Sequence, residues 1–392
     1  MSFSSLLGIV SRVSGGSWRS TVAQDTLFGG VAGGMPRLRS LATANWAVNQ
    51  ARGGLQGQHK KTPLLAWCQQ GAAVSSLSNP RRQKSPASLS VGRRRGISTG
   101  GSSSAKAATG RGDAGGDGVA FSTSEDAARR NADPGAVAFV TGANRGIGLE
   151  VTHQLLARSR GTVVAACRDP SIAADLHALG TAAGNKDRLD VVRMDIEDQA
   201  SLEAAAEHVK SAYGRVDLLF NIAGVLGDGK NTPGPERSLR AMDRGWLRHT
   251  LEVNTIGPMM LVAALTPLLE SPAKKGDRGA RPPSVVVNFS ARVGSIGDNG
   301  MGGWHSYRMS KSALNMATKG ISLELRRRRV WAFSYHPGTT DTGLSEPFQA
   351  NVKPEKLFTP DYTVSQCLAI VDSMTEEHSG GFFAFDGSRI VW

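Results

Sequence analysis

The sequence predicts an α/β protein whose single folded domain, residues 131–392, is built on a doubly wound parallel sheet. From Pro134 onward, short apolar segments of strand length alternate with segments of helical periodicity. Such alternation is typical of parallel strands joined by right-handed crossover helices. Residues 1–130 are rich in Ser, Gly, Arg and Ala and show no sustained periodicity. We therefore expect a disordered N-terminal extension there.

The predicted elements follow one another in a regular order. Apolar runs indicate strands at residues 136–140, 162–167, 189–194, 216–220, 284–289, 330–335 and 382–385. Helical periodicity occurs at residues 147–156, 202–209, 247–270, 307–325 and 364–374. Ligands of such sheets bind at the carboxyl ends of the strands, so we expect the functional residues at that edge.

Three connecting segments are longer than turns. Residues 227–240 and 271–283 are rich in Gly, Pro and charge, which predicts surface insertions. Residues 343–380 separate the last two strands and are expected to cover a bound substrate as a lid.

The first predicted strand ends in a glycine-rich turn. Gly142, Gly146 and Gly148 have the spacing G-x-x-x-G-x-G and precede a helical pattern. Strand, glycine turn and helix in this order present the free N–H groups of a helix N-terminus to a phosphate. Glycines allow the backbone to approach such a ligand closely.

Positive charge is concentrated before residue 113. Residues 1–112 carry 15 of the 46 Lys and Arg residues but only one of the 33 acidic residues, Asp25. Arg-rich, Ser-rich and acid-poor composition is typical of an organelle targeting peptide. Residues 93–100 resemble a mitochondrial processing site, and residues 100–118 indicate a flexible linker. We expect import into mitochondria. The alternatives are import into chloroplasts and a disordered basic tail that binds acidic partners.

The rest of the chain is nearly neutral, which argues against nucleic-acid binding. Cys68, Cys167 and Cys367 are isolated, so the sequence predicts neither a metal site nor a disulfide framework. No run of 18 apolar residues occurs, and we therefore expect no membrane span.

A tyrosine and a lysine open the helical pattern that follows the fifth predicted strand. Tyr307 and Lys311 are four residues apart and therefore share one helical face. An ammonium group beside a phenol lowers the pKa of the phenol. A tyrosine with a pKa near neutrality can exchange a proton with a carbonyl or alcohol oxygen during hydride transfer.

Together these motifs resemble the short-chain dehydrogenase/reductase family over residues 134–392. The matching segments are TGANRGIG at 141–148, Asp195, NIAG at 221–224, Asn254, YRMSK at 307–311, and Pro337-Gly338 with Thr342. Within the family the chain is similar to C-factor and Sniffer-type carbonyl reductases. That similarity is carried by residues 291–296, 302–307 and 382–392.

The resemblance implies a Rossmann fold and a role for each matching residue. Tyr307 would be the general acid/base, Lys311 would lower its pKa and hold the nicotinamide ribose, and Asn254 would anchor a water of the proton relay. Asp195 and Ile196 would flank the adenine. Other residues expected to bind the cofactor are Gly142, Asn144, Arg145, Gly146, Ile147, Gly148, Arg168, Asn221, Ala223, Gly224, Pro337, Gly338 and Thr342.

The chain departs from the family at one catalytic position. The family usually has a serine three residues after the position of Asn288, where this sequence has Ala291. Neighbouring side chains on a regular strand point to opposite faces, but a bend at a strand end can redirect one of them. We hypothesise that Ser290, or a water near it, replaces the missing hydroxyl. His336 fits a strand-end turn as well as a functional role, and we favour the turn.

The sequence thus predicts an oxidoreductase that moves a hydride between NADP(H) and a small carbonyl or alcohol substrate. NAD(H) is the less favoured cofactor, because Arg168 and Arg145 suit a 2′-phosphate, although Asp169 competes by suiting a 2′-OH. The alternative is a non-catalytic dinucleotide-binding protein that senses redox state or serves as a scaffold. The family implies a homodimer or homotetramer.

Overall fold

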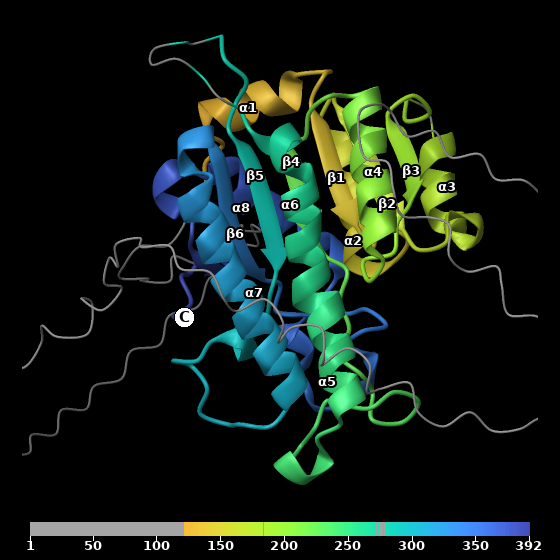
Figure 1. The fold of residues 1–392 in the computed structure, drawn as a ribbon, viewed down its shortest axis with the longest axis vertical. Coiled ribbons are helices and arrows are strands. Elements are labelled where there is room, and N and C mark those ends of the chain that lie inside the picture. Colours follow the sequence, from red (N-terminus) through yellow and green to blue (C-terminus); the bar gives the residue numbers. More distant parts are fainter. Residues whose placement is uncertain (1–120, 183, 272, 274–276, 278) are drawn as a thin grey trace, which may run out of the picture. The chain divides into compact units, whose positions relative to one another are not determined.

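Seven parallel strands form the central sheet of the computed structural model, which describes residues 121–392 except 183, 272, 274–276 and 278 (Figure 1). Their order is β3-β2-β1-β4-β5-β6-β9. The strands are β1 (Val137–Thr141), β2 (Thr162–Cys167), β3 (Leu189–Arg193), β4 (Leu218–Asn221), β5 (Ser284–Phe289), β6 (Val330–His336) and β9 (Phe382–Ala384). The predicted doubly wound parallel sheet is confirmed, and each predicted strand overlaps one of these seven.

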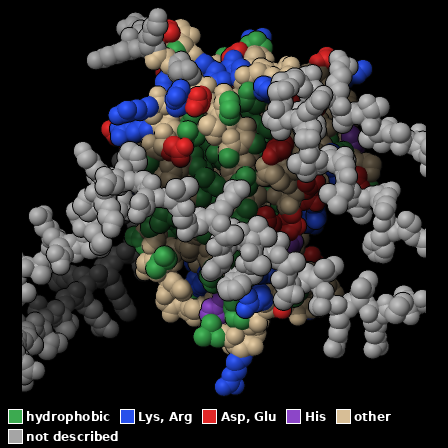
Figure 2. Space-filling model, viewed as in Figure 1, with side chains coloured by type: hydrophobic (Ala, Val, Ile, Leu, Met, Phe, Trp, Pro, Cys, Tyr) green, Lys and Arg blue, Asp and Glu red, His purple; other side chains and the backbone are tan. Residues whose placement is uncertain are grey.

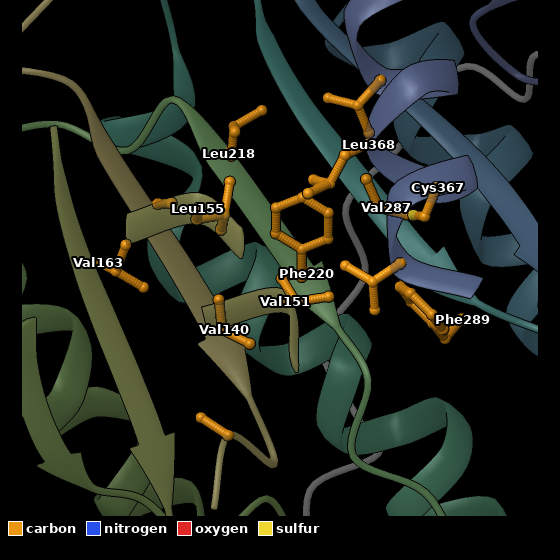
Figure 3. Packing of buried hydrophobic residues seen from close by; sticks show 14 of the residues in the cluster. Val140, Val151, Leu155, Val163, Leu218, Phe220, Val287, Phe289, Cys367 and Leu368 are labelled. Atoms are coloured by element: carbon orange, nitrogen blue, oxygen red, sulfur yellow. The ribbon is translucent and has the colours of Figure 1, made fainter. Parts of the chain in front are cut away.

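Helices cover both faces of the sheet. One face packs against α2 (Gly146–Arg158), α3 (Ala174–Thr181) and α8 (Pro360–Ser373), and Figure 3 shows part of that packing around Phe220 and Val287. The other packs against α4 (Gln199–Ala212), α6 (Gly257–Leu269) and α7 (His305–Glu324), which lie in front of the sheet in Figure 1. All five predicted helices are present, whereas the sequence did not indicate α3.

The longest helical segment of the described residues changes its geometry in the middle. α5 (Arg244–Leu251) continues through one π-helical turn, η3 (Glu252–Ile256), into α6. By length and composition this segment, 244–269, is apolar enough to cross a membrane. Its residues Leu261, Leu265 and Leu269 are fully buried against the sheet, as in the core helix of a globular domain.

The folded part begins earlier than predicted. α1 (Glu125–Ala132) contains Arg130, which is buried and donates a hydrogen bond to Asp372 of α8. Ala127 of the same helix is also buried. The predicted domain boundary at 130/131 therefore falls inside α1, an eight-residue helix that has four charged residues and only alanines as apolar residues. The predicted targeting peptide, processing site and linker lie largely in residues 1–120, outside the described residues.

Two further features of the described part bear on the predictions. Cys167 and Cys367 are free, buried thiols, and Cys68 lies outside the described residues. Hydrophobic side chains lie across the middle of the face shown in Figure 2, where α6 and α7 run. Exposed apolar residues of these two helices and the adjoining π turn are Ile256, Met259, Met260, Met309, Met316 and Leu323. The homodimer or homotetramer stays a prediction.

Candidate active site

The carboxyl ends of β1 and β4 meet where the strand order reverses. Thr141, the last residue of β1, accepts hydrogen bonds at Oγ1 from the backbone N–H groups of Ile222 and Ala223, at 2.9 and 3.1 Å. Asn221 donates from Nδ2 to Oδ1 of Asn288 on β5, at 2.8 Å, while its own Oδ1 is buried without a partner among the described residues. These bonds fix the NIAG segment at the switch point, where such sheets bind dinucleotides.

The glycine turn between β1 and α2 forms a cradle that side chains would fill. Gly142 and Gly146 have φ angles of 65° and 55°, a region that suits glycine. A Cβ on Gly148 would collide with the carbonyl oxygen of Gly142, and one on Gly142 would lie 3.2 Å from Cα of Ala223. The first turn of α2 has no side-chain cap, so its N–H groups remain available to a phosphate. The cradle therefore fits a dinucleotide.

Residues expected around the adenosine end lie at the neighbouring strand ends. Arg145 and Arg168 are exposed, and no hydrogen bond or ion pair engages either guanidinium within the described residues. Asp169 instead accepts hydrogen bonds from the backbone N–H and the hydroxyl of Ser171. Asp195 follows β3 and makes a local turn with Glu197, and Ile196 next to it is buried.

Tyr307 and Lys311 lie side by side in the first two turns of α7, and both side chains are buried. The Lys311 Nζ lies 5.7 Å from the centre of the Tyr307 ring and donates a 2.8 Å hydrogen bond to the carbonyl of Phe289 at the end of β5. The lysine therefore ties α7 to the carboxyl edge of the sheet. This confirms that the two residues share one helical face.

The expected lowering of the tyrosine pKa is not found. Burial raises the pKa of Tyr307 above its usual value of 10, and burial also lowers the pKa of Lys311 from 10.5 to about 8. Desolvation thus outweighs the attraction between the ammonium and a phenolate at this separation. In this arrangement the phenol is protonated at neutral pH, which suits a proton donor.

Asn254 lies at the centre of the π turn η3. Its Oδ1 accepts a hydrogen bond from the N–H of Val225, and its Nδ2 donates to the carbonyl of Val225 and to Oγ of Ser310 on α7. The amide therefore joins the segment after β4 to the helix that carries Tyr307. π turns are frequent at functional sites because the extra residue redirects a side chain. The water-anchoring role of Asn254 stays a prediction.

Ser290 has a hydrogen-bond partner of its own. Its hydroxyl donates a 2.7 Å hydrogen bond to Oδ1 of Asn315 on α7, and Asn315 Nδ2 in turn donates to the carbonyl of Gly294. Ala291 continues the extended backbone with φ −149° and ψ 148°. To donate to a substrate, the Ser290 hydroxyl would have to leave Asn315, so its catalytic role stays a prediction.

A family model described as short chain dehydrogenase matches residues 136–353. The chain belongs to the short-chain dehydrogenase family. The predicted family and Rossmann fold are therefore confirmed.

Curated relatives of this dehydrogenase include 1-hydroxy-2-glutathionyl-2-methyl-3-butene dehydrogenase of Rhodococcus sp., 30% identical over 65% of this chain and 98% of the relative. The C-signal protein of Myxococcus xanthus is 32% identical over 46% of this chain and 94% of its own length. Among solved structures, an NADPH-bound carbonyl reductase from chicken fatty liver is 30% identical, with a TM-score of 0.56 over 66% of this chain and 98% of that one. Carbonyl reductase Sniffer of D. melanogaster is 26% identical, with a TM-score of 0.56 over 66% and 100% of the two chains. The predicted similarity to C-factor and Sniffer-type proteins is thus confirmed.

A cavity of about 1080 Å³ opens beside Tyr307 in this dehydrogenase. Its walls include the end of β5, the start of α7 and the segment after β6, with η6 (Glu346–Asn351) on one side. Residues Leu344, Phe348 and Val352 border it, and the expectation that residues 343–380 cover a bound substrate as a lid stays a prediction. The cofactor-side residues Ile147, Pro337, Gly338 and Thr342 border it as well, and Thr342 lies against Gly146.

The sequence did not identify the aromatic and acidic residues of this cavity. Trp304 lies in the left-handed region, with φ 51°, and its ring contacts the rings of Tyr307 and Phe348 at centroid distances of 6.4 and 5.3 Å. Residues 227–240, predicted to be a surface insertion, form part of the wall, and their Glu236 is buried. The Gly and Pro content indicated a loop correctly but says nothing of what the loop packs against.

Proposed function

We propose that this dehydrogenase reduces the carbonyl group of a small molecule with NADP(H). The observation that carries the proposal is the placement of buried Tyr307, with Lys311 beside it, at the wall of a cavity that Ile147 of the glycine turn also borders. The cradle fits a dinucleotide, and the cavity is bordered by apolar and aromatic residues, as sites for small molecules generally are.

A bound NADPH would supply the hydride to the carbonyl carbon, and residues of this chain would supply the proton and hold the reacting groups. Tyr307 donates its phenolic proton to the carbonyl oxygen, for which its raised pKa keeps it protonated. Lys311 stabilises the phenolate that remains, because its ammonium lies above the ring face. Asn254 holds α7 against the segment after β4 and so keeps Tyr307 in position.

The preference for NADP(H) over NAD(H) rests on charge. Arg145 lies at the N-terminus of α2, and Arg168 follows β2, where an acidic residue would favour a 2′-OH. Asp169 is engaged by Ser171 and leaves both guanidinium groups open to a 2′-phosphate. The chicken carbonyl reductase, which was solved with NADPH, supports the same preference.

A comparison of the full chain with its Tyr307→Phe variant tests the function. We expect the wild type to oxidise NADPH when 4-nitrobenzaldehyde or a quinone is added, and Tyr307→Phe to lower the turnover roughly 10²–10⁴-fold. NADPH binding, followed by its fluorescence, should be unchanged. NADPH binding without turnover of either carbonyl compound would favour the alternative, a non-catalytic protein that senses redox state or acts as a scaffold.

We also propose that residues 1–130 direct the protein to mitochondria, with chloroplasts as the alternative. Their composition supports this proposal. A fluorescent protein fused after residue 130 should enter the organelle, and its retention in the cytosol would contradict the proposal.

A further inference from the structure

His336 lies beside the position where the family serine is missing. Phe289 of β5 pairs in register with Tyr335 of β6, and the N–H of Ser290 donates to the carbonyl of Tyr335 at 2.8 Å. The pairing of the two strands therefore continues to their ends and brings His336 next to Ser290 and Ala291. His336, Ala291 and Tyr307 all border the same cavity.

The imidazole of His336 has no hydrogen-bond partner among the described residues. Its Nδ1 is buried without a partner, and no hydrogen bond joins Nε2 to a described residue. Because neither ring nitrogen is engaged by a described residue and the ring borders the cavity, an N–H of the imidazole is free to bind a molecule there. His336 is the last residue of β6. The predicted strand-end position involves only its backbone, so it leaves the role of the side chain open.

The surroundings of the ring keep it neutral. Burial, together with the guanidinium of Arg292 after β5, lowers the pKa of His336 to about 4, although the carboxylate of Asp386 after β9 acts in the opposite direction. A neutral imidazole carries one N–H donor and one acceptor nitrogen. At neutral pH His336 can therefore donate one hydrogen bond without bringing a charge into the cavity.

We propose that the Nε2–H of His336 donates a hydrogen bond to the carbonyl oxygen of the substrate and replaces the serine hydroxyl missing at Ala291. The proposal rests on the proposed reductase function. As hydride reaches the carbonyl carbon, negative charge develops on the oxygen, and a donor already aimed at that oxygen lowers the barrier. Tyr307 supplies the proton and His336 supplies the second donor; the histidine keeps its own proton throughout.

Ser290 is the less suitable donor for this role. A hydroxyl has a single proton, and that of Ser290 is directed to Oδ1 of Asn315. Asn315 is held in this orientation because its Nδ2 donates to the carbonyl of Gly294. His336 has no such commitment within the described residues, so it can bind a substrate without losing an existing bond.

The test uses the full chain and three substitutions at these positions. We expect His336→Ala to lower the turnover of 4-nitrobenzaldehyde with NADPH roughly 10²–10³-fold, with NADPH affinity unchanged. His336→Gln, which keeps an N–H, and the double variant His336→Ala/Ala291→Ser should each recover at least about tenfold of that loss. His153→Ala, an exposed histidine on α2, serves as the control and should behave as the wild type.

A second measurement separates this proposal from the proposed function. Titration of 4-nitrobenzaldehyde into the NADP⁺-loaded protein reports binding where no hydride can be transferred, and His336→Ala should weaken it about tenfold. Wild-type turnover in His336→Ala, or a loss that neither His336→Gln nor Ala291→Ser relieves, would overturn the role of His336. If the wild type turns over no aldehyde, the reductase function fails, and weaker binding in His336→Ala would still support the contact. Equal binding of the aldehyde by the wild type and by His336→Ala would overturn the proposed contact.

Discussion

Replacing Lys311 by methionine should make the protein more stable and inactive. Lys311 is only 5% exposed, and its burial lowers the pKa from 10.5 to about 8. At about 1.4 kcal/mol per pKa unit, holding the ammonium in the folded state at pH 7 costs roughly 3 kcal/mol. Loss of the hydrogen bond to Phe289 offsets about 1 kcal/mol of this gain. We therefore expect Lys311→Met to raise the unfolding free energy by about 2 kcal/mol.

The difference in unfolding free energy between Lys311→Met and the wild type should depend on pH, and the lowered pKa of Lys311 fixes the direction. Below pH 8 the lysine is protonated in both the folded and the unfolded chain, so the cost is present in full. Between pH 8 and 10.5 the unfolded chain binds more protons than the folded chain, and the wild type gains stability relative to the variant as the pH rises. The difference between the two should therefore shrink across this window, reach zero near pH 10, and then reverse by up to about 1 kcal/mol as only the lost hydrogen bond to Phe289 remains.

Urea unfolding of both full chains at pH 7, 8, 9 and 10 measures this difference. Lys319→Met, at an exposed lysine on the same helix, is the matched control and should change the unfolding free energy by less than about 0.5 kcal/mol. A Lys311→Met protein that is less stable at pH 7, or a difference that stays constant from pH 7 to 10, would refute the reasoning. Lys311→Met should lose turnover with NADPH, whereas Lys319→Met should keep it.

Three further results are expected. A chain that begins at Phe121 should unfold at the same urea concentration as the full chain. A chain that begins at Asp133 should lose roughly 2 kcal/mol, because Asp372 keeps its ion pair with Arg158 but loses the hydrogen bonds from Arg130 and Asn131; equal stability of both would contradict the role given to α1. Arg168→Ala should weaken NADPH binding at least about tenfold while leaving NADH binding unchanged, and an equal effect on both cofactors would argue against a 2′-phosphate contact. Ser290→Ala should lower turnover less than about tenfold, and a loss of 10²-fold or more would identify Ser290 as the missing donor.

The sheet was predictable because most of its strands are buried on both faces; β3, at the edge, is only half-buried. Strands such as β2 and β5 then appear as uninterrupted apolar runs, and both begin and end where the sequence predicts. α1 and α3 are short helices with few buried residues, so their sequences carry little periodicity. The π turn at Asn254 was not predictable, because an extra residue in a helical turn leaves no local sequence signal.

The cofactor side of the site could be predicted and the substrate side could not. Gly142, Gly146 and Gly148 are needed locally by one turn, so their spacing alone points to the cradle. Trp304 and Phe348, in contrast, come from segments 44 residues apart that meet only in the fold. No local pattern requires an aromatic residue at either position, because the two rings contact each other only in the folded chain.

One carboxylate joins the wall of the cavity to α7. Glu236, in the segment predicted to be a surface insertion, accepts hydrogen bonds from the N–H and the hydroxyl of Ser306 in the first turn of α7. Its own carbonyl accepts from the N–H of Trp304 at 2.5 Å. A negative charge at a helix N-terminus is stabilised by the helix dipole, which explains how a buried carboxylate is tolerated here without a cationic partner among the described residues. Because Tyr307 follows Ser306 directly, the loop that borders the cavity also fixes the start of the helix that carries the proposed proton donor.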